Sequence, residues 1–202
     1  MEFPPPPPPG VAHVSVDDSN EGNVINAEFT RLIAQLKSPE ADTRAAAAEA
    51  LCQAGDDAAA FAPPLVEAVK DEDRRVVQWA NAALEGMGPP TADHAGTLAR
   101  LLDDPSPDIA YWAATLLGRL GGRAAEDPAV VSALARCLMG HPAVSARERA
   151  AWALGQIGPA AQAALPALSQ AQTAGGPRLT RLAQKAVDLI KHSKQDGKTA
   201  SE

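Results

Sequence analysis

The side chains that could support catalysis or metal binding are few and scattered along this chain. Four histidines stand singly in turns and tails, where solvated residues are common: His13, His94, His141 and His192. The acidic runs 71–73 and 103–104 fall at helix ends and turns, which indicates solvated capping and turn residues and not general acid–base pairs. Cys52 and Cys137 lie far apart without a CxxC pattern, so we expect two reduced thiols. The sequence therefore predicts no catalytic residue, no metal and no cofactor.

Recognition of a partner is the chemistry that the other side chains could support, since Trp, Tyr and Arg anchor many protein interfaces. Charge is distributed unevenly between the two halves of the chain. Residues 28–104 carry 14 acids and 7 bases, a net of −7, whereas residues 105–190 carry 5 acids and 8 bases, a net of +3. Such polarity could orient a partner. The plainer interpretation is a solvated surface with scattered ion pairs of little energetic weight.

A recurring phrase sets the positions of these side chains. It reads DTRAAAAEALCQAG, RVVQWANAALEGMG, DIAYWAATLLGRLG and SARERAAWALGQIG, and it ends at Gly55, Gly88, Gly121 and Gly158, with spacings of 33, 33 and 37 residues. A fixed period of this size is typical of stacked repeats, because one unit cannot bury its apolar face alone. We therefore predict an all-α fold, an α–α superhelix (solenoid) of about five helical hairpins.

Each predicted unit has a first helix, a turn and a second helix. The first helices are expected at 28–37, 62–70, 93–102, 128–138 and 161–170. The second helices are expected at 42–54, 74–86, 108–120, 145–157 and 178–191. Positions one, four, five and eight before each closing glycine are apolar, which predicts the core stripe. The glycines are expected as left-handed helix ends, and Asp42 and Asp108 as N-caps. The fifth unit has Lys191 in place of the glycine and a more charged second helix, so it is interpreted as a cap.

The concave face of the solenoid is the expected binding surface. With 100° per residue, positions three, six and ten before the glycine point away from the core. They are Ala45, Glu49, Cys52, Gln78, Ala82, Glu85, Tyr111, Thr115, Gly118, Glu148, Trp152, Gly155, Arg181, Lys185 and Asp188. Tyr111 and Trp152 fall on adjacent repeats there, although Trp152 could instead fold against the neighbouring unit. The candidate partner-binding residues are Tyr111, Trp152, Arg149, Arg181, Lys185, Gln78 and Glu49. Trp79 and Trp112 fall where repeats meet and are expected to pack.

The ends of the chain differ from the repeats in composition. Residues 1–27 begin with a proline run, Pro4–Pro9, and continue with acids and no Lys or Arg, which predicts a disordered tail. The proline run could dock on an aromatic groove, but a solubilising leader is the interpretation that we favour. Residues 28–192 form the predicted repeat domain, and 193–202 a disordered polar tail. With no secretory signal or bilayer-spanning run and a net charge of −7, we expect a cytoplasmic monomer that binds neither nucleic acid nor membrane.

The phrase D-x-R-x-x-A-x-x-A-L-x-x-x-G resembles HEAT repeats, and more narrowly the bacterial HEAT-like repeats also found in phycobilisome lyase subunits. The resemblance covers roughly residues 28–190. It implies a ladder in which a turn Asp and an early Arg of the second helix join neighbouring repeats. Asp42 with Arg44 fits this ladder, whereas Arg147 lacks its Asp and Val77 stands in an Arg position. Related enzymes bind di-iron through His-Glu pairs, and no histidine here is followed by Glu.

Taken together, these features predict a non-enzymatic scaffold that binds a protein or peptide on the concave face. Two alternatives stay open. The resemblance allows a lyase-like accessory that attaches a bilin chromophore. The chain could also be a regulatory part of a larger multidomain protein.

Overall fold

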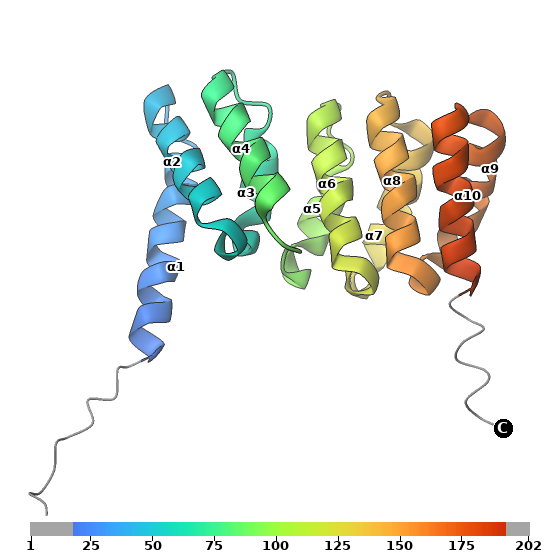
Figure 1. Cartoon of the computed structure of the whole chain (residues 1–202), viewed down its shortest axis with the longest axis horizontal. Helices are drawn as coiled ribbons and strands as arrows, with labels where there is room; N and C mark the ends of the chain where they lie inside the picture. Colours follow the sequence, from blue (N-terminus) through green and yellow to red (C-terminus); the bar gives the residue numbers. More distant parts are fainter. Residues whose placement is uncertain (1–17, 193–202) are drawn as a thin grey trace, which may run out of the picture.

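The computed structural model describes residues 18–192, and the regular structure of that part is entirely helical. Ten α-helices alternate between two layers (Figure 1). The first-helix layer holds α1 (Asp18–Gln35), α3 (Ala62–Ala68), α5 (Ala95–Leu101), α7 (Pro128–Gly140) and α9 (Leu165–Ala174). The second-helix layer holds α2 (Ala41–Gln53), α4 (Arg74–Gly86), α6 (Pro107–Leu120), α8 (Val144–Ile157) and α10 (Pro177–His192). The predicted all-α solenoid of five hairpins is confirmed.

The second helices begin and end within one residue of their predicted bounds, whereas the first helices differ more. Four 3-10 segments explain part of the difference: η1 (Gly55–Phe61), η2 (Ala92–His94), η3 (Gly121–Glu126) and η4 (Gly158–Ala164). In η4 the non-helical backbone of Ala161 (φ −87°, ψ 18°) delays the start of α9 to Leu165. The tighter 3-10 turns η1, η3 and η4 reverse the chain just after α2, α6 and α8.

Helix α1 begins ten residues earlier than predicted, at Asp18. Residues 18–27, which the sequence analysis placed in a disordered tail, are therefore helical. The segment contains no proline, which would interrupt a helix. The rest of that predicted tail, residues 1–17 with the proline run, lies outside the described residues, as does the predicted tail 193–202.

Three of the four closing glycines adopt the backbone that the sequence predicts. Gly55, Gly121 and Gly158 have φ of 58°, 58° and 69°, which is unfavourable for residues with a Cβ. Gly88 differs, because α4 ends at Gly86 and Met87 is extended. Pro89 follows Gly88 and disfavours helical backbone there. The Gly88 N–H donates instead to Asp56 Oδ1 of the preceding repeat at 2.7 Å.

The N-caps lie at different residues from those predicted. Asp42 and Asp108 fall inside the first turns of α2 and α6, after N-cap residues Glu40 and Ser106 that make no side-chain capping bond. Elsewhere an aspartate does cap a helix: Asp73 accepts from the Arg75 N–H at 2.8 Å at the start of α4, and Asp127 caps α7 in the same way. The observed N-caps of α2 and α6 precede the predicted ones by two residues, which places both aspartates in the first turn.

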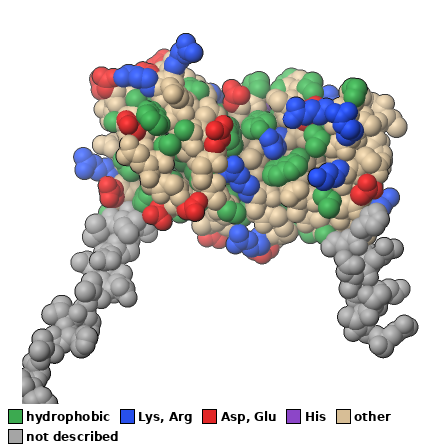
Figure 2. All heavy atoms as spheres, viewed as in Figure 1, with side chains coloured by type: hydrophobic (Ala, Val, Ile, Leu, Met, Phe, Trp, Pro, Cys, Tyr) green, Lys and Arg blue, Asp and Glu red, His purple; other side chains and the backbone are tan. Residues whose placement is uncertain are grey.

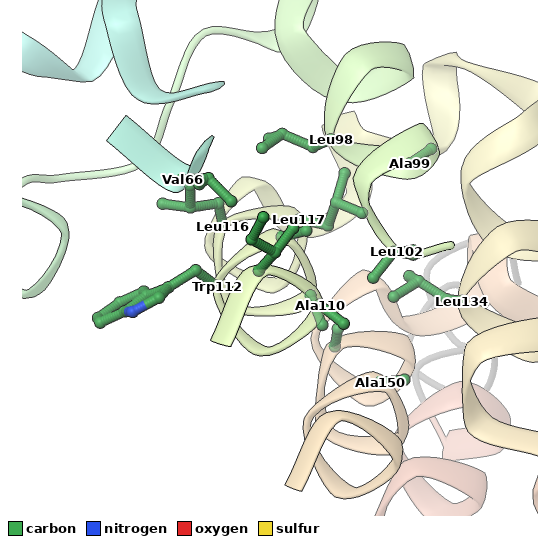
Figure 3. Packing of buried hydrophobic residues seen from close by; sticks show 14 of the residues in the cluster. Val66, Leu98, Ala99, Leu102, Ala110, Trp112, Leu116, Leu117, Leu134 and Ala150 are labelled. Carbon is green, nitrogen blue, oxygen red and sulfur yellow. The ribbon is translucent and has the colours of Figure 1, made fainter. Parts of the chain in front are cut away.

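One contiguous hydrophobic cluster extends from Phe29 in α1 to Ile190 in α10. The small residues predicted eight positions before each glycine are all buried: Ala47, Ala80, Ala113 and Ala150. Figure 3 shows Leu116 and Leu117 of α6 between Val66 of α3 and Leu98 of α5. Burial of these side chains from helices of adjacent repeats is the main stabilising contribution to the stack.

Helices α4 and α6 are spaced more widely than the other neighbouring second helices, which pack along one another (Figure 1). Large side chains of α6 bridge this spacing. The Trp112 Nε1–H donates to Asn81 Oδ1 at 2.7 Å, and Arg119 Nη1 donates to the carbonyls of Leu84 and Met87 at 2.7 and 2.9 Å. The predicted packing role of Trp112 is confirmed, and Arg119 satisfies carbonyls at the end of α4 that lack helical partners.

The inter-repeat ladder is well formed between the first two repeats. The guanidinium of Arg44, a buried residue, donates to both carboxylate oxygens of Asp71 at 2.7 and 2.9 Å and also to the carbonyls of Ser38 and Pro39. Asp42 pairs with Arg75 of the second repeat at 2.7 Å. Further along the stack, Lys70 pairs with Asp104 at 2.8 Å, which links the second and third repeats in place of the arginine missing at Val77.

Candidate binding site on the second-helix layer

Three of the predicted binding residues come together where α6 and α8 pack. The guanidinium of Arg149 in α8 lies 4.4 Å from the ring centroid of Tyr111 in α6 and 5.0 Å from that of Trp152. It also donates a hydrogen bond to the Tyr111 hydroxyl. A cation over an aromatic face is attracted by the negative potential of the ring. The three side chains are half-buried, so they form an ordered cluster that still faces solvent.

Trp152 adopts the alternative that the sequence left open, because it packs against the neighbouring repeat. A Cβ placed on Gly118 of α6 would lie 2.3 Å from Trp152 Cζ3, so the indole rests directly on the backbone of α6. The side chain is nevertheless only half-buried. One part of the indole holds α6 and α8 together, and the remainder is available to a ligand.

Beside this cluster lies a pocket of about 480 Å³, which we call the aromatic pocket. It is lined by Tyr111 of α6, by Ser145, Glu148, Arg149 and Trp152 of α8, and by Arg178 and Leu182 of α10. Three consecutive repeats thus contribute its walls. The lining combines aromatic and apolar side chains with a serine and three charged groups, and a binding pocket likewise combines apolar contact with a few polar groups that orient a ligand.

Helix α10 contributes the predicted Lys185 and three residues that the sequence did not predict: Arg178, Leu182 and Leu189. Arg178 and Leu182 line the aromatic pocket, and Leu182, Lys185 and Leu189 line a small adjoining hollow that also touches Trp152. Leu189 is 39% exposed, which is unusual for a leucine in this chain. The spacing of the four residues places them on one face of the helix, and this spacing is the signal that could have found Leu182 and Leu189. Arg181, which was predicted, is exposed but lines neither hollow.

The charge around the aromatic pocket is mainly positive. Arg178 pairs with Glu148 at 3.2 Å, whereas Arg149, Arg181 and Lys185 make no ion pair with a carboxylate in the described part of the chain. Desolvation lowers the pKa of the nearby Arg119, and repulsion from Arg149 lowers it further. Figure 2 shows Lys and Arg over the half of this face that carries α6, α8 and α10, and more Asp and Glu over α2 and α4.

Two predicted residues lie away from the pocket. Gln78 on α4 is exposed, and Glu49 on α2 is half-buried and accepts a weak hydrogen bond of 3.4 Å from Gln53. Several other positions of the predicted face are buried and cannot reach a ligand: Ala45, Thr115, Gly118 and Gly155. The next second helix covers two of them: Trp152 lies against Gly118, and Ala186 and Leu189 lie against Gly155. The binding roles of the candidate residues stay predictions.

Groups that could do acid–base or thiol chemistry have structural roles. His141 is buried, not solvated as predicted: its Nδ1 accepts from the Ala143 N–H, and Nε2 donates to the Asp104 carbonyl at 3.0 Å. Burial raises the pKa of the Cys137 thiol to about 12, so this thiol is neutral and unreactive near pH 7. Among the residues whose side chains the structure describes, no group of His, Cys, Asp and Glu is suited to a metal ion.

The repeat pattern has a counterpart in a described family. The sequence model of HEAT repeats matches residues 29–95 and again 95–188. The chain belongs to the HEAT-repeat family. This HEAT-repeat chain matches no curated protein. The two matched segments meet at Ala95, the first residue of α5. This helix lies in sequence between α4 and α6, the two widely spaced second helices.

Solved structures similar to this HEAT-repeat chain include designed armadillo repeat proteins. One, solved in complex with a (KR)4 peptide, is 17% identical, and the match covers 88% of each chain with a TM-score of 0.56. Another designed armadillo repeat protein is 18% identical over 86% of this chain and 88% of its own, with a TM-score of 0.54. An engineered protein shares 20% identity over 85% of this chain and 49% of its own, also at 0.54. At these identities the likeness concerns the fold. Within the described residues, every helix is too short or too polar to cross a membrane.

Proposed function

We propose that this HEAT-repeat chain is a non-enzymatic scaffold that holds a protein or peptide segment on its second-helix layer. The observation that carries the proposal is the half-exposed cluster of Tyr111, Arg149 and Trp152 beside the aromatic pocket. Aromatic and arginine side chains in a pocket are the usual energetic centre of an interface. Because three repeats build the pocket, a segment that crosses the repeats would contact all of them.

The peptide complex of the designed armadillo repeat protein supports this proposal. That protein shares this fold and was solved with a bound peptide. A stack of repeats offers a continuous surface, which suits a partner that crosses several of them. We extend the proposal to a cytoplasmic monomer that binds neither nucleic acid nor membrane, with the net charge of −7 as its support against nucleic acid.

Membership of the bacterial lyase-type group of HEAT-like proteins rests on the sequence resemblance alone. It predicts a shifted absorption spectrum when a free bilin is mixed with the chain. An unchanged spectrum would contradict that alternative without affecting the scaffold proposal.

Selection of random peptides displayed on phage against the immobilised full chain tests the scaffold proposal. We expect enriched sequences whose binding is lost in Arg149→Met, which keeps a long side chain between the two rings but removes the charge and the donors. Arg136→Met is the matched control, since Arg136 is exposed on the first-helix layer and pairs with Asp103 at 3.1 Å. Failure to enrich any peptide, or equal binding by wild type and Arg149→Met, would contradict the proposal.

A further inference from the structure

The side of α10 that faces α8 alternates between cations and leucines. Arg178, Leu182, Lys185 and Leu189 are separated by four, three and four residues, so they share one face of the helix. Leu182 and Leu189 continue the apolar strip that begins at Tyr111 and Trp152. Apolar and cationic side chains thus alternate along this strip. A surface of this kind is complementary to a segment that has apolar side chains flanked by carboxylates.

The acids of this region are already engaged. Glu148 is only 13% exposed and is held by Arg178. Asp188 accepts a hydrogen bond from Gln184 Nε2 at 2.9 Å. In contrast, Arg149, Arg181 and Lys185 have no carboxylate partner within residues 27–191. Three cations without counter-ions beside an aromatic pocket give a positive potential that an anionic ligand would neutralise.

We infer that the partner of this surface is an acidic amphipathic peptide segment, which places an aromatic or aliphatic side chain in the aromatic pocket and carboxylates against Arg149, Arg181 and Lys185. This inference rests on the proposed function and names the chemistry of its partner. Arg149 donates to a carboxylate from its position between the two rings, while Arg181 and Lys185 contribute longer-range attraction from exposed positions. Leu182 and Leu189 bury apolar side chains of the segment.

A peptide fits these observations better than a nucleic acid, which is also anionic and stacks on aromatics. Nucleic-acid grooves need many cations to replace the counter-ions of successive phosphates. Here three free cations stand in a chain of net charge −7, with leucines between them. Leucine side chains contribute little to stacking with bases but much to contact with an apolar peptide face.

Fluorescence anisotropy with labelled synthetic ligands tests the inference on the full chain. The first peptide has leucines at helical spacing, one central tryptophan and glutamates elsewhere. A second peptide has lysines in place of the glutamates, and a third has serines in place of the leucines and tryptophan. The fourth ligand is an oligothymidylate of similar length. We expect the first peptide to bind about tenfold or more tightly than each of the others, and its affinity to fall as salt rises.

Charge reversal at exposed positions localises the binding. Arg181→Glu with Lys185→Glu should weaken binding of the first peptide by about tenfold or more. Arg100→Glu with Arg123→Glu changes the net charge by the same amount at exposed residues of α5 and η3, and should change affinity less than about twofold. Circular dichroism confirms that both variants are folded.

The possible outcomes distinguish failure of this inference from failure of the scaffold proposal on which it rests. Tighter binding of the lysine or serine peptide, or of the oligonucleotide, contradicts the acidic amphipathic partner. Peptides selected by phage display that still require Arg149 would then leave the scaffold proposal intact. Absence of binding by all four ligands, together with a display selection that enriches nothing, would contradict both. An equal loss of affinity for the first peptide in the two charge-reversal variants would also contradict the inference, because it would show a general effect of net charge.

Discussion

The indole of Trp152 in α8 lies on the backbone of Gly118 in α6, where a Cβ would come within 2.3 Å of Cζ3 and 2.9 Å of Cε3. Two helices of adjacent repeats therefore meet through the largest side chain and the smallest residue. The contact fixes the indole beside Arg149, whose guanidinium lies 5.0 Å from the Trp152 ring. The same packing that joins the third and fourth repeats thus shapes one wall of the aromatic pocket.

Gly118→Ala tests this relationship. Alanine favours a helix interior over glycine by about 1 kcal/mol, so without the indole the substitution should stabilise the chain. Because Trp152 must move, we expect a net loss of about 1–3 kcal/mol in the free energy of unfolding by urea. Gly86→Ala is the control, since no atom lies within 4 Å of a Cβ placed there. A Gly118→Ala variant as stable as wild type would contradict the close contact.

Arg119→Met tests the bridge across the wide spacing between α4 and α6. The substitution removes the hydrogen bonds to the carbonyls of Leu84 and Met87 and leaves them without that partner. We expect the free energy of unfolding to fall by about 1–2 kcal/mol. This is the lower end of the range for hydrogen bonds to charged groups, because the guanidinium is half-exposed. Hydrogen exchange should quicken in α1–α4 more than in α7–α10, since neighbouring repeats stabilise each other locally. A uniform change along the chain would contradict this account.

Acid should weaken the ladder between repeats. The side chain and N–H of Arg75 lower the pKa of Asp73 from 3.8 to about 2. Burial raises the pKa of Asp71, but hydrogen bonds from Arg44 and from the Asp73 N–H outweigh it, so the net shift is downward. A carboxyl group whose pKa is lower in the folded chain than in the unfolded chain stabilises the fold at pH values above its unfolded pKa. This contribution is lost as the pH falls through the folded pKa. We therefore expect unfolding midpoints to drop between about pH 4 and pH 2.

Asp73→Asn separates this effect from general acid unfolding. Asparagine can still cap α4 but cannot titrate, so the variant should lose part of the pH dependence measured by urea unfolding. Glu126→Gln is the control, because Glu126 is exposed and makes no ion pair in the described part of the chain. Identical pH profiles for Asp73→Asn and wild type would show that the Asp73 carboxylate contributes nothing.

The two thiols should differ in reactivity. Burial raises the pKa of Cys137 to about 12, so the thiolate that attacks an alkylating reagent is scarce, and the side chain is also enclosed. Cys52 is half-buried on the second-helix layer and is reachable. Iodoacetamide near pH 8 should label one cysteine per folded chain and two after unfolding, as counted by mass spectrometry. Labelling of both at the same rate in the folded chain would contradict the burial of Cys137.

The period of the sequence predicts the second helices well because burial requires a regular stripe. Ala47, Ala80, Ala113 and Ala150 are buried where the spacing from the closing glycine places them. Gly88 departs from the pattern because Pro89 follows it, an effect that the sequence could have indicated. The early start of α1 at Asp18 was not predicted, because that helix has little apolar periodicity in its first turns.

The candidate site was predicted in part. Helical spacing placed Tyr111 and Trp152 on neighbouring helices, but the contact of Trp152 with Gly118 depends on the register between α6 and α8, which a single sequence does not encode visibly. The ring contacts of Arg149 follow from the same register. Leu182 and Leu189 were missed because they lie nine and two residues before Lys191, outside the positions three, six and ten that define the predicted face. Trp112 and Arg119 bridge the wide spacing between α4 and α6 through hydrogen bonds, and the repeat pattern does not distinguish these two positions from the others.

Hydrogen–deuterium exchange of the full chain, with and without the leucine- and glutamate-rich peptide, tests the central claim most directly. If the second-helix layer around the aromatic pocket is the binding surface, saturating peptide will slow exchange in α8 and α10 and at the adjoining turns. Exchange in α1–α4 will change little. Slower exchange confined to α1–α4 or to the first-helix layer, or no change at saturation, would contradict the claim that this HEAT-repeat chain holds its partner there.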